Sequence, residues 1–154
     1  VKIDNDARSF LSGEYMFGAG RRYKNLIGMT FGTGIGGGII VNRAMFYGAN
    51  GSAGELGHMM MGGYDWEFLI LKQKKPSKKD LGIGLANIVN ILDPEVIIVG
   101  GGASGPLKYL FPKAKKIMNK FIISPKSKKN VKIIMGKLGE NAGAIGAAAL
   151  FYEP

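Results

Sequence analysis

The chain has 154 residues, 46% of them hydrophobic, which fits a single globular domain with a core of its own. It has no apolar run of the ~18 residues that a membrane-spanning helix needs, and its lack of cysteine excludes disulfide bonds and thiolate metal sites. Its formal net charge of +10 is typical either of a nucleic-acid-binding protein or of a solvated, lysine-rich surface.

Hydrophobic periodicity predicts alternating secondary-structure elements along the chain. The first half is predicted as a strand ending within 3–6, a helix over 7–17, and strands over 26–31, 35–41 and 44–47 that form an antiparallel meander. A glycine-rich loop over 48–63 and a lysine-rich linker over 72–79 follow. The second half is predicted as a helix over 81–92, a strand over 95–99, a helix over 106–121, a strand over 131–135 and a helix over 140–151. We therefore expect an α/β fold with one mixed five-stranded sheet and helices on both faces.

The turn between the first two meander strands is the most informative motif, because residues 32–38 hold five glycines. Backbone N–H groups in a turn with so few side chains converge into a concavity that binds an anion, and the Thr33 hydroxyl adds a donor. A plain tight turn also uses glycine, for its positive φ. Glycine within a strand, however, suits a place where another group approaches closely. We expect Gly32, Thr33 and Gly34 to bind phosphate.

Asn5 and Asp6 lie at a predicted strand-to-helix junction. An Asp at this place is often a helix N-cap. The alternative is a general base, because phosphoryl transfer to an alcohol needs a carboxylate that accepts the hydroxyl proton. Asn5 could then bind a second hydroxyl of the same substrate.

Glu55 and His58 lie three residues apart in the glycine-rich loop. A carboxylate accepts from two neighbouring hydroxyls, and a neutral imidazole both donates and accepts, so the pair suits a polyhydroxylated ligand. An ordinary exposed loop histidine is the alternative. A metal site would need further ligands close by.

Gly100, Gly101 and Gly102 follow the apolar strand predicted over 95–99. Open α/β sheets bind ligands outside the carboxyl ends of their strands, where glycine lets an adenine or a ribose lie against the backbone. A strand-to-helix turn would use the same glycines.

The basic residues are mostly lysines in loops and on helix faces, and no aromatic stacking pattern interleaves with them. We therefore expect no direct nucleic-acid binding, and instead an attraction for anionic nucleotides. The lack of cysteine suits a cytoplasmic protein, and no membrane partner is expected.

Taken together, these segments resemble the ROK family of repressors, open reading frames and sugar kinases. Residues 30–42 resemble the family's phosphate hairpin, and residues 48–59 resemble its sugar-binding signature. Residues 3–7 resemble the segment with the catalytic Asp. Residues 81–102 resemble the helix and strand before the adenosine site, and residues 139–148 resemble the closing helix. It covers most of the chain outside 60–80 and 106–130.

The resemblance implies an actin-like, ribonuclease-H-like fold and ATP-dependent phosphorylation of a hexose with Mg²⁺. It implies that Asp6 is the general base and that the sugar hydroxyls are held by Asn5, Glu55 and His58. By the same resemblance, residues 32–34 face the ATP phosphates and residues 100–102 lie by the adenosine. It also allows a homodimer.

The chain departs from the family pattern in three ways. Residues 60–80 replace a stretch that carries a zinc-binding cysteine cluster and a further sugar-binding Glu. A helical segment before Leu81 is short or missing, and the N-terminal lobe, with its own phosphate turn, is absent. We therefore expect residues 1–154 to be the C-terminal lobe of a larger sugar kinase, without structural zinc. A sugar-sensing transcription repressor of the same family is the alternative, and a catalytically inactive domain is a third.

Overall fold

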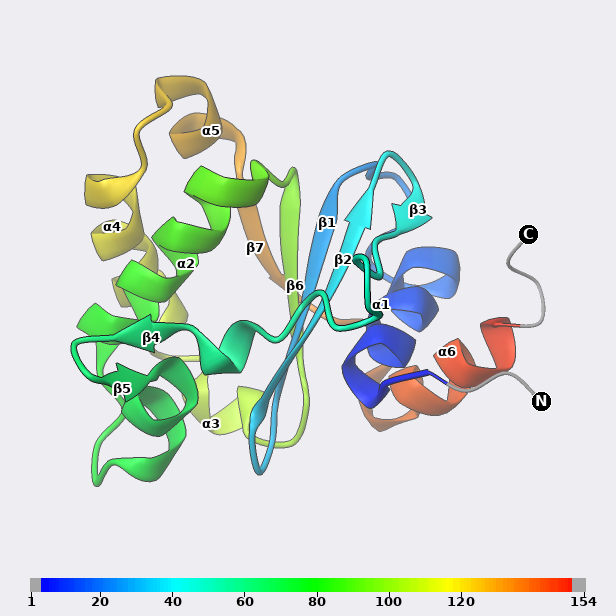
Figure 1. Cartoon of the computed structure of the whole chain (residues 1–154), viewed down its shortest axis with the longest axis horizontal. Helices are drawn as coiled ribbons and strands as arrows, with labels where there is room; N and C mark the ends of the chain where they lie inside the picture. The colour runs from blue at the N-terminus through cyan, green and yellow to red at the C-terminus, as the bar shows by residue number, and fades with distance from the viewer. Residues whose placement is uncertain (1–3, 151–154) are drawn as a thin grey trace.

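The computed structural model describes residues 4–150 (Figure 1). The expected first strand lies partly outside this range, and Asp4 and Asn5 form no strand. The helices are α1 (Asp6–Phe17), α2 (Lys78–Leu92), α3 (Ser104–Leu107), α4 (Phe111–Phe121), α5 (Pro125–Asn130) and α6 (Ala142–Ala149). The strands are β1 (Leu26–Phe31), β2 (Ile35–Val41), β3 (Ala44–Met45), β4 (Met60–Met61), β5 (Tyr64–Asp65), β6 (Val96–Gly100) and β7 (Lys132–Met135).

The predicted mixed five-stranded sheet is confirmed, with the strand order β3-β2-β1-β6-β7. Strand β1 pairs antiparallel with β2 and parallel with β6, and β7 pairs parallel with β6. Strands β4 and β5 form a separate two-stranded hairpin. The carboxyl ends of β1 and β6 therefore lie at the same edge of the sheet, where the glycine turns after Phe31 and Gly100 meet.

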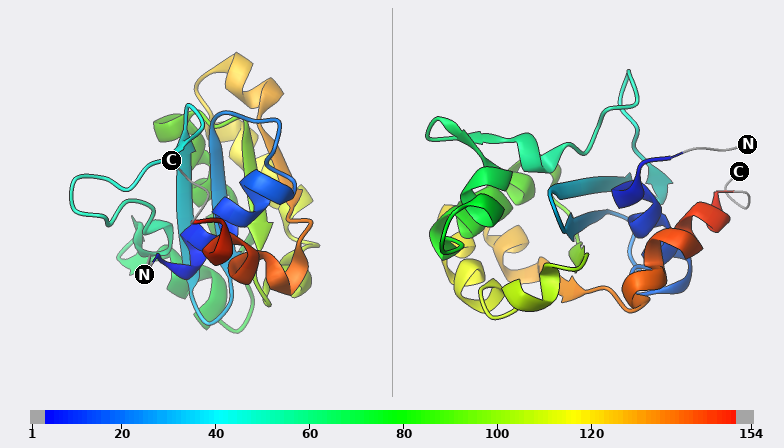
Figure 2. Two further views of the ribbon diagram at one scale, coloured as in Figure 1. Left: turned by 90° about the vertical axis from the view of Figure 1, so that its right-hand side faces the viewer. Right: turned by 90° about the horizontal axis from the view of Figure 1, so that it is seen from below.

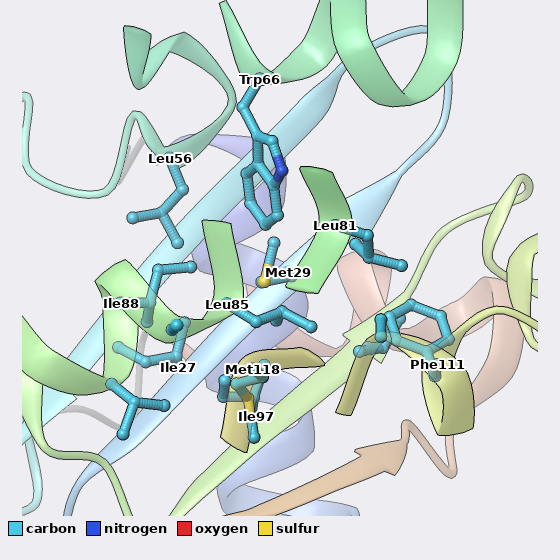
Figure 3. Packing of buried hydrophobic residues seen from close by; sticks show 14 of the residues in the cluster. Ile27, Met29, Leu56, Trp66, Leu81, Leu85, Ile88, Ile97, Phe111 and Met118 are labelled. Carbon is cyan, nitrogen blue, oxygen red and sulfur yellow. The ribbon is translucent and has the colours of Figure 1, made fainter. Parts of the chain in front are cut away.

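Helices cover both faces of the sheet (Figures 1 and 2). Helices α2 and α4 pack together on one face, and α1 and α6 pack together on the other. Strand β6 is apolar throughout because both of its faces are buried: Ile97 and Val99 join the core under α2 and α4, and Val96 and Ile98 join the core under α1. Figure 3 shows the larger core, in which the fully buried side chains include Ile27, Met29, Trp66, Leu85 and Ile97.

Local sequence signals account for several element boundaries. Ser77 is the N-cap of α2, because its hydroxyl accepts from the Asp80 amide at 3.1 Å. The helix predicted over 106–121 is instead two helices, α3 and α4, and Pro112 lies in the first turn of α4, where its missing N–H costs nothing. Helix α5 was not expected, although Ser124 caps it and Pro125 begins it.

Two predicted elements are shorter in the structure, and one predicted loop is more regular. The third meander strand covers only Ala44–Met45, and the last helix begins at Ala142 after a single 3-10 turn. The loop over 48–63 is not fully irregular, since it contains the 3-10 turn Leu56–His58 and strand β4. Within residues 4–150, no helix has both the length and the apolar character needed to cross a bilayer.

Candidate active site

A cleft of about 260 Å³ opens at the turn between β1 and β2. It is lined by Asp6 at the start of α1, by Thr30 and the turn residues 32–36, and by Glu67. The structure thus brings the predicted base, Asp6, together with the predicted phosphate turn. Asn5, Glu55 and His58 do not line this cleft.

The glycines of the hairpin fall into two groups. Gly32 is exposed, and a Cβ built on it would meet nothing within 4 Å, so it leaves the turn open to a ligand. Gly36 and Gly38, in contrast, let α1 approach β2, because their Cβ atoms would lie 2.7 Å from the Ala7 Cβ and 3.2 Å from a Leu11 methyl carbon. A Cβ on Gly37 would overlap the Gly54 carbonyl oxygen. The close approach expected from these glycines is therefore made largely by the protein itself.

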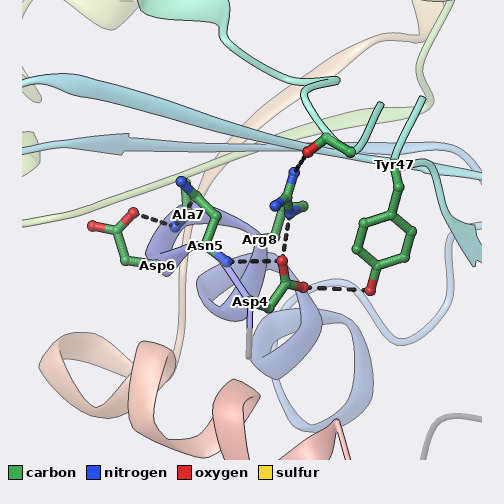
Figure 4. Close-up of polar contacts among 7 residues, drawn as sticks. Asp4, Asn5, Asp6, Ala7, Arg8 and Tyr47 are labelled. Carbon is green, nitrogen blue, oxygen red and sulfur yellow. Dashed lines mark hydrogen bonds and ion pairs between the residues drawn. The ribbon is translucent and has the colours of Figure 1, made fainter. Parts of the chain in front are cut away.

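Asn5, not Asp6, is the N-cap of α1. The Asn5 side-chain oxygen accepts from the Ala7 amide at 2.9 Å, and one Asp6 oxygen accepts from the same amide at 2.8 Å. Asp6 is the first helical residue and is exposed. Among the described residues, its other carboxylate oxygen accepts no hydrogen bond from the helix, which leaves an acceptor at the cleft (Figure 4).

Arg8, one turn into α1, ties the start of this helix to the glycine-rich loop (Figure 4). Its guanidinium pairs with Asp4, donates to the Gly51 carbonyl oxygen at 2.8 Å, and lies 5.3 Å from the centre of the Tyr47 ring. The Tyr47 hydroxyl in turn lies 3.4 Å from an Asp4 oxygen, and the Asn5 amide donates to Asp4 at 2.7 Å. The segment that carries Asn5 and Asp6 is therefore bonded to the loop that carries Glu55.

Glu55 and His58 are both exposed on this loop. Between them, Leu56 is buried in the larger core, and Gly57 packs against the Ile35 carbonyl. His58 Nδ1 lies 4.0 Å from an Asp65 oxygen, at the limit of ion-pair distance. The core therefore anchors the loop at Leu56, and the side chains of Glu55 and His58, the two candidate sugar-binding residues, stay exposed.

Glu67 is the site residue that sequence reasoning missed. One of its oxygens accepts from the Ile35 amide at 2.9 Å, and the other pairs with Lys72 Nζ at 2.7 Å. The Lys72 hydrogen bond and the Ile35 amide hold the pKa of Glu67 below its usual value. Its signal was an acidic residue, one of two with Asp65, within the otherwise apolar stretch 64–71. Glu67 thus lines the cleft from within 60–80, the segment expected to depart from the family pattern.

A second cavity, of about 330 Å³, lies beyond the carboxyl end of β6. Gly100, Gly101 and Gly102, the residues expected to lie by the adenosine, line it together with Phe10 and Ser104. Gly101 has a φ of +86° and packs on the end of β1, as a tight turn requires. Gly102 is exposed and meets nothing within 4 Å, so packing does not account for it.

Within the part of the chain that the structure describes, no three His, Asp or Glu residues gather closely enough to hold a metal ion. The sequence contains no cysteine, so the family's cysteine cluster has no counterpart.

The ROK family model matches residues 1–77 and 70–153. The chain belongs to the ROK family. The two matches meet at 70–77, in the segment where the sequence departs from the family pattern. Glucokinase from Streptomyces coelicolor is 28% identical over 214 positions that cover the whole chain, and xylose repressor from Bacillus spizizenii is 27% identical over 99% of it. Because 214 positions exceed the chain's 154 residues, the glucokinase carries additional residues within the aligned span.

Solved ROK structures confirm the actin-like fold. A protein assigned as a sugar kinase from Cytophaga hutchinsonii superposes with a TM-score of 0.86 at 28% identity, over 99% of this chain and 65% of that one. A ROK family glucokinase from Streptomyces griseus in complex with glucose and AMPPNP gives 0.81 at 25% identity, over 96% of this chain and 67% of that one. The chain spans 63% to 68% of the length of three curated relatives that it matches.

Proposed function

We propose that this chain forms the C-terminal lobe of a kinase that phosphorylates a hexose with ATP, with Asp6 as the general base. One observation carries the proposal: Asp6 and the glycine turn 32–34 line the same cleft. A base and a phosphate cradle that face one small volume are what phosphoryl transfer to an alcohol requires. The family relationship to glucokinases supports the same reaction class.

In this proposal the Asp6 carboxylate accepts the proton of the attacking sugar hydroxyl. The open backbone around Gly32 and the Thr33 hydroxyl bind the transferred phosphate, and residues 100–102 contact the adenosine. Asn5, Glu55 and His58 bind the other sugar hydroxyls. Asp6 and Glu67 are the carboxylates that line this cleft, and a Mg²⁺ ion held with the ATP phosphates there would neutralise part of their charge.

The test is the Asp6→Asn substitution in the protein at its full natural length. We expect kcat to fall by about 10²–10⁴-fold, because the amide cannot accept the proton, while the sugar Kd stays within about twofold. Asp80→Asn, in the first turn of α2 and outside the cleft, is the matched control and keeps full activity. Undiminished turnover by the Asp6 variant would refute the proposed base.

A sugar-sensing repressor is the second candidate, favoured by the match to the xylose repressor. A sensor needs to bind a sugar but needs no base in a phosphate cleft, so the position of Asp6 favours the kinase. Sugar binding without any turnover of ATP by the unsubstituted protein would reverse this preference.

A further inference from the structure

Glu14 is a buried acidic residue that the proposed reaction does not use. It lies in α1, two turns after Asp6, and its exposed fraction is 0%. Among residues 4–150, no Lys, Arg or His forms an ion pair with it. A carboxylate removed from water in this way needs hydrogen-bond donors in compensation.

Two backbone amides supply those donors, one to each oxygen. The Ala19 amide donates to Oε2 at 2.8 Å, just after the end of α1. The Leu138 amide donates to Oε1, also at 2.8 Å, from a segment 124 residues further along the chain. Glu14 therefore joins α1 to the connection between β7 and α6.

Glycines make room for this carboxylate on both sides. A Cβ on Gly136 would lie 2.7 Å from Oε1, and a Cβ on Gly18 would overlap Oε2. Neither residue has a positive φ, and a side chain at either position would collide with the Glu14 carboxylate. The protein thus leaves space for the Glu14 carboxylate on both of its sides.

The segment held by Glu14 forms a wall of the second cavity. Gly136 and Gly139 line that cavity, on either side of Leu138 along the chain, and the Gly136 amide donates to the Val99 carbonyl at 2.9 Å. Phe10, one helical turn before Glu14 on the same side of α1, lines it as well. Helix α1 therefore carries Asp6 at the first cleft, Phe10 in one wall of the second cavity, and Glu14, which supports the wall formed by residues 136–139.

We propose that Glu14 is a positioning residue for nucleotide binding, which holds the 136–139 wall at its distance from residues 100–102. This inference rests on the proposed function, because it takes the second cavity as the adenosine site. Glu14 acts through the Leu138 amide and does not itself line the cavity.

The test compares Glu14→Gln with two further variants by calorimetric titration of the full-length protein. Glutamine keeps the size of the side chain but has a single acceptor oxygen, so one of the two amides loses its partner. We expect the Kd for AMP-PNP to rise about tenfold, while the Kd for the hexose that the protein binds stays within about twofold. Glu14→Asp, which is shorter and keeps the charge, should weaken nucleotide binding in the same selective way if the glutamine variant does not fold.

Glu95→Ala is the matched control. Glu95 also accepts from two backbone amides, those of Lys24 and Asn25 at 2.6 and 2.9 Å, but it lies at the amino end of β6 and lines neither cavity. This variant should be less stable and bind AMP-PNP normally.

The outcomes separate the inference from the proposed function. If the unsubstituted protein binds AMP-PNP and a folded Glu14 variant binds it equally well, the role of Glu14 is overturned and the proposed function is left standing. An equal loss of nucleotide and hexose affinity would show a general structural role and overturn the inference too. If the unsubstituted protein does not bind AMP-PNP, both proposals fail.

Discussion

The phosphate cleft and the glycine-rich loop are built in different ways. The cleft is formed by a turn between two paired strands of the central sheet, and Glu67 fixes one end of that turn. The loop over 48–63 has few regular hydrogen bonds, and it is held at separate points by Arg8, by the contact of Gly54 with Gly37, and by buried Leu56. Strand pairing thus fixes the proposed phosphate-binding turn, whereas the position of the proposed sugar-binding loop depends on a few anchors.

Disturbing an anchor of the glycine-rich loop should have the largest effect on stability. Gly37→Ala places a methyl group against the Gly54 backbone and Leu56, neither of which can move without displacing the loop. We expect a loss of roughly 2–3 kcal/mol in the free energy of unfolding, as for overpacked cores. Urea denaturation measures it.

Gly32→Ala is the control for this prediction, because a methyl group there meets nothing within 4 Å. Its stability should stay within about 0.5 kcal/mol of that of the unsubstituted protein. Equal stability losses for the two variants would contradict the distinction between packed and open glycines in this hairpin.

Arg8→Met should have an intermediate effect that is specific to the sugar. The change removes the ion pair with Asp4 and the hydrogen bond to Gly51, which hold the loop near Asp6. We expect the KM for the hexose to rise about tenfold, equivalent to about 1.4 kcal/mol, while the KM for ATP is unchanged. Steady-state kinetics with each substrate varied in turn measure both values.

Arg21→Met removes the same charge at a position that has no ion pair among the described residues, so it should leave both KM values unchanged. If Arg8→Met raised the two KM values equally, Arg8 would not act through the sugar loop.

The smallest effect is expected from Glu67→Gln, and it should depend on pH. The pKa of Glu67 is lowered in the folded protein, so its stabilisation is present above its ordinary pKa of about 4.5 and is lost as the pH falls through the lowered value. The variant should therefore lose less stability than the unsubstituted protein as the pH falls below about 4.5.

Thermal unfolding measures the difference in stability between the variant and the unsubstituted protein. The measurements run from about pH 3 to about pH 7, so that they extend on both sides of the ordinary Glu67 pKa of about 4.5. Parallel curves for the two proteins would contradict the role of Glu67 in fixing the turn.

The sequence predicted those features that depend on residues close together in the chain. The β1–β2 hairpin and the apolar strand β6 both follow from local patterns, and the structure has them. The family resemblance added the fold, which no local pattern contains. Asp6 was expected to be either a cap or a base, and the structure gives the cap to Asn5.

The remaining features depend on contacts between distant segments. Glu67 lies 32 residues from the amide it binds, and Glu14 lies 124 residues from Leu138. The glycines at 36–38 appeared to serve a ligand, because a sequence does not show which part of the chain will pack against a strand. Tertiary packing decides such contacts, and a single sequence contains no periodicity that reports them.

The most direct test of the central claim is a crystal structure of the full-length protein with its hexose and AMP-PNP. The account predicts one Asp6 oxygen within hydrogen-bond distance, about 2.6–3.2 Å, of a sugar hydroxyl. It also predicts the terminal phosphate against the backbone of residues 32–34. Phosphates bound away from this turn, or a sugar whose hydroxyls all lie beyond the reach of Asp6, would contradict it.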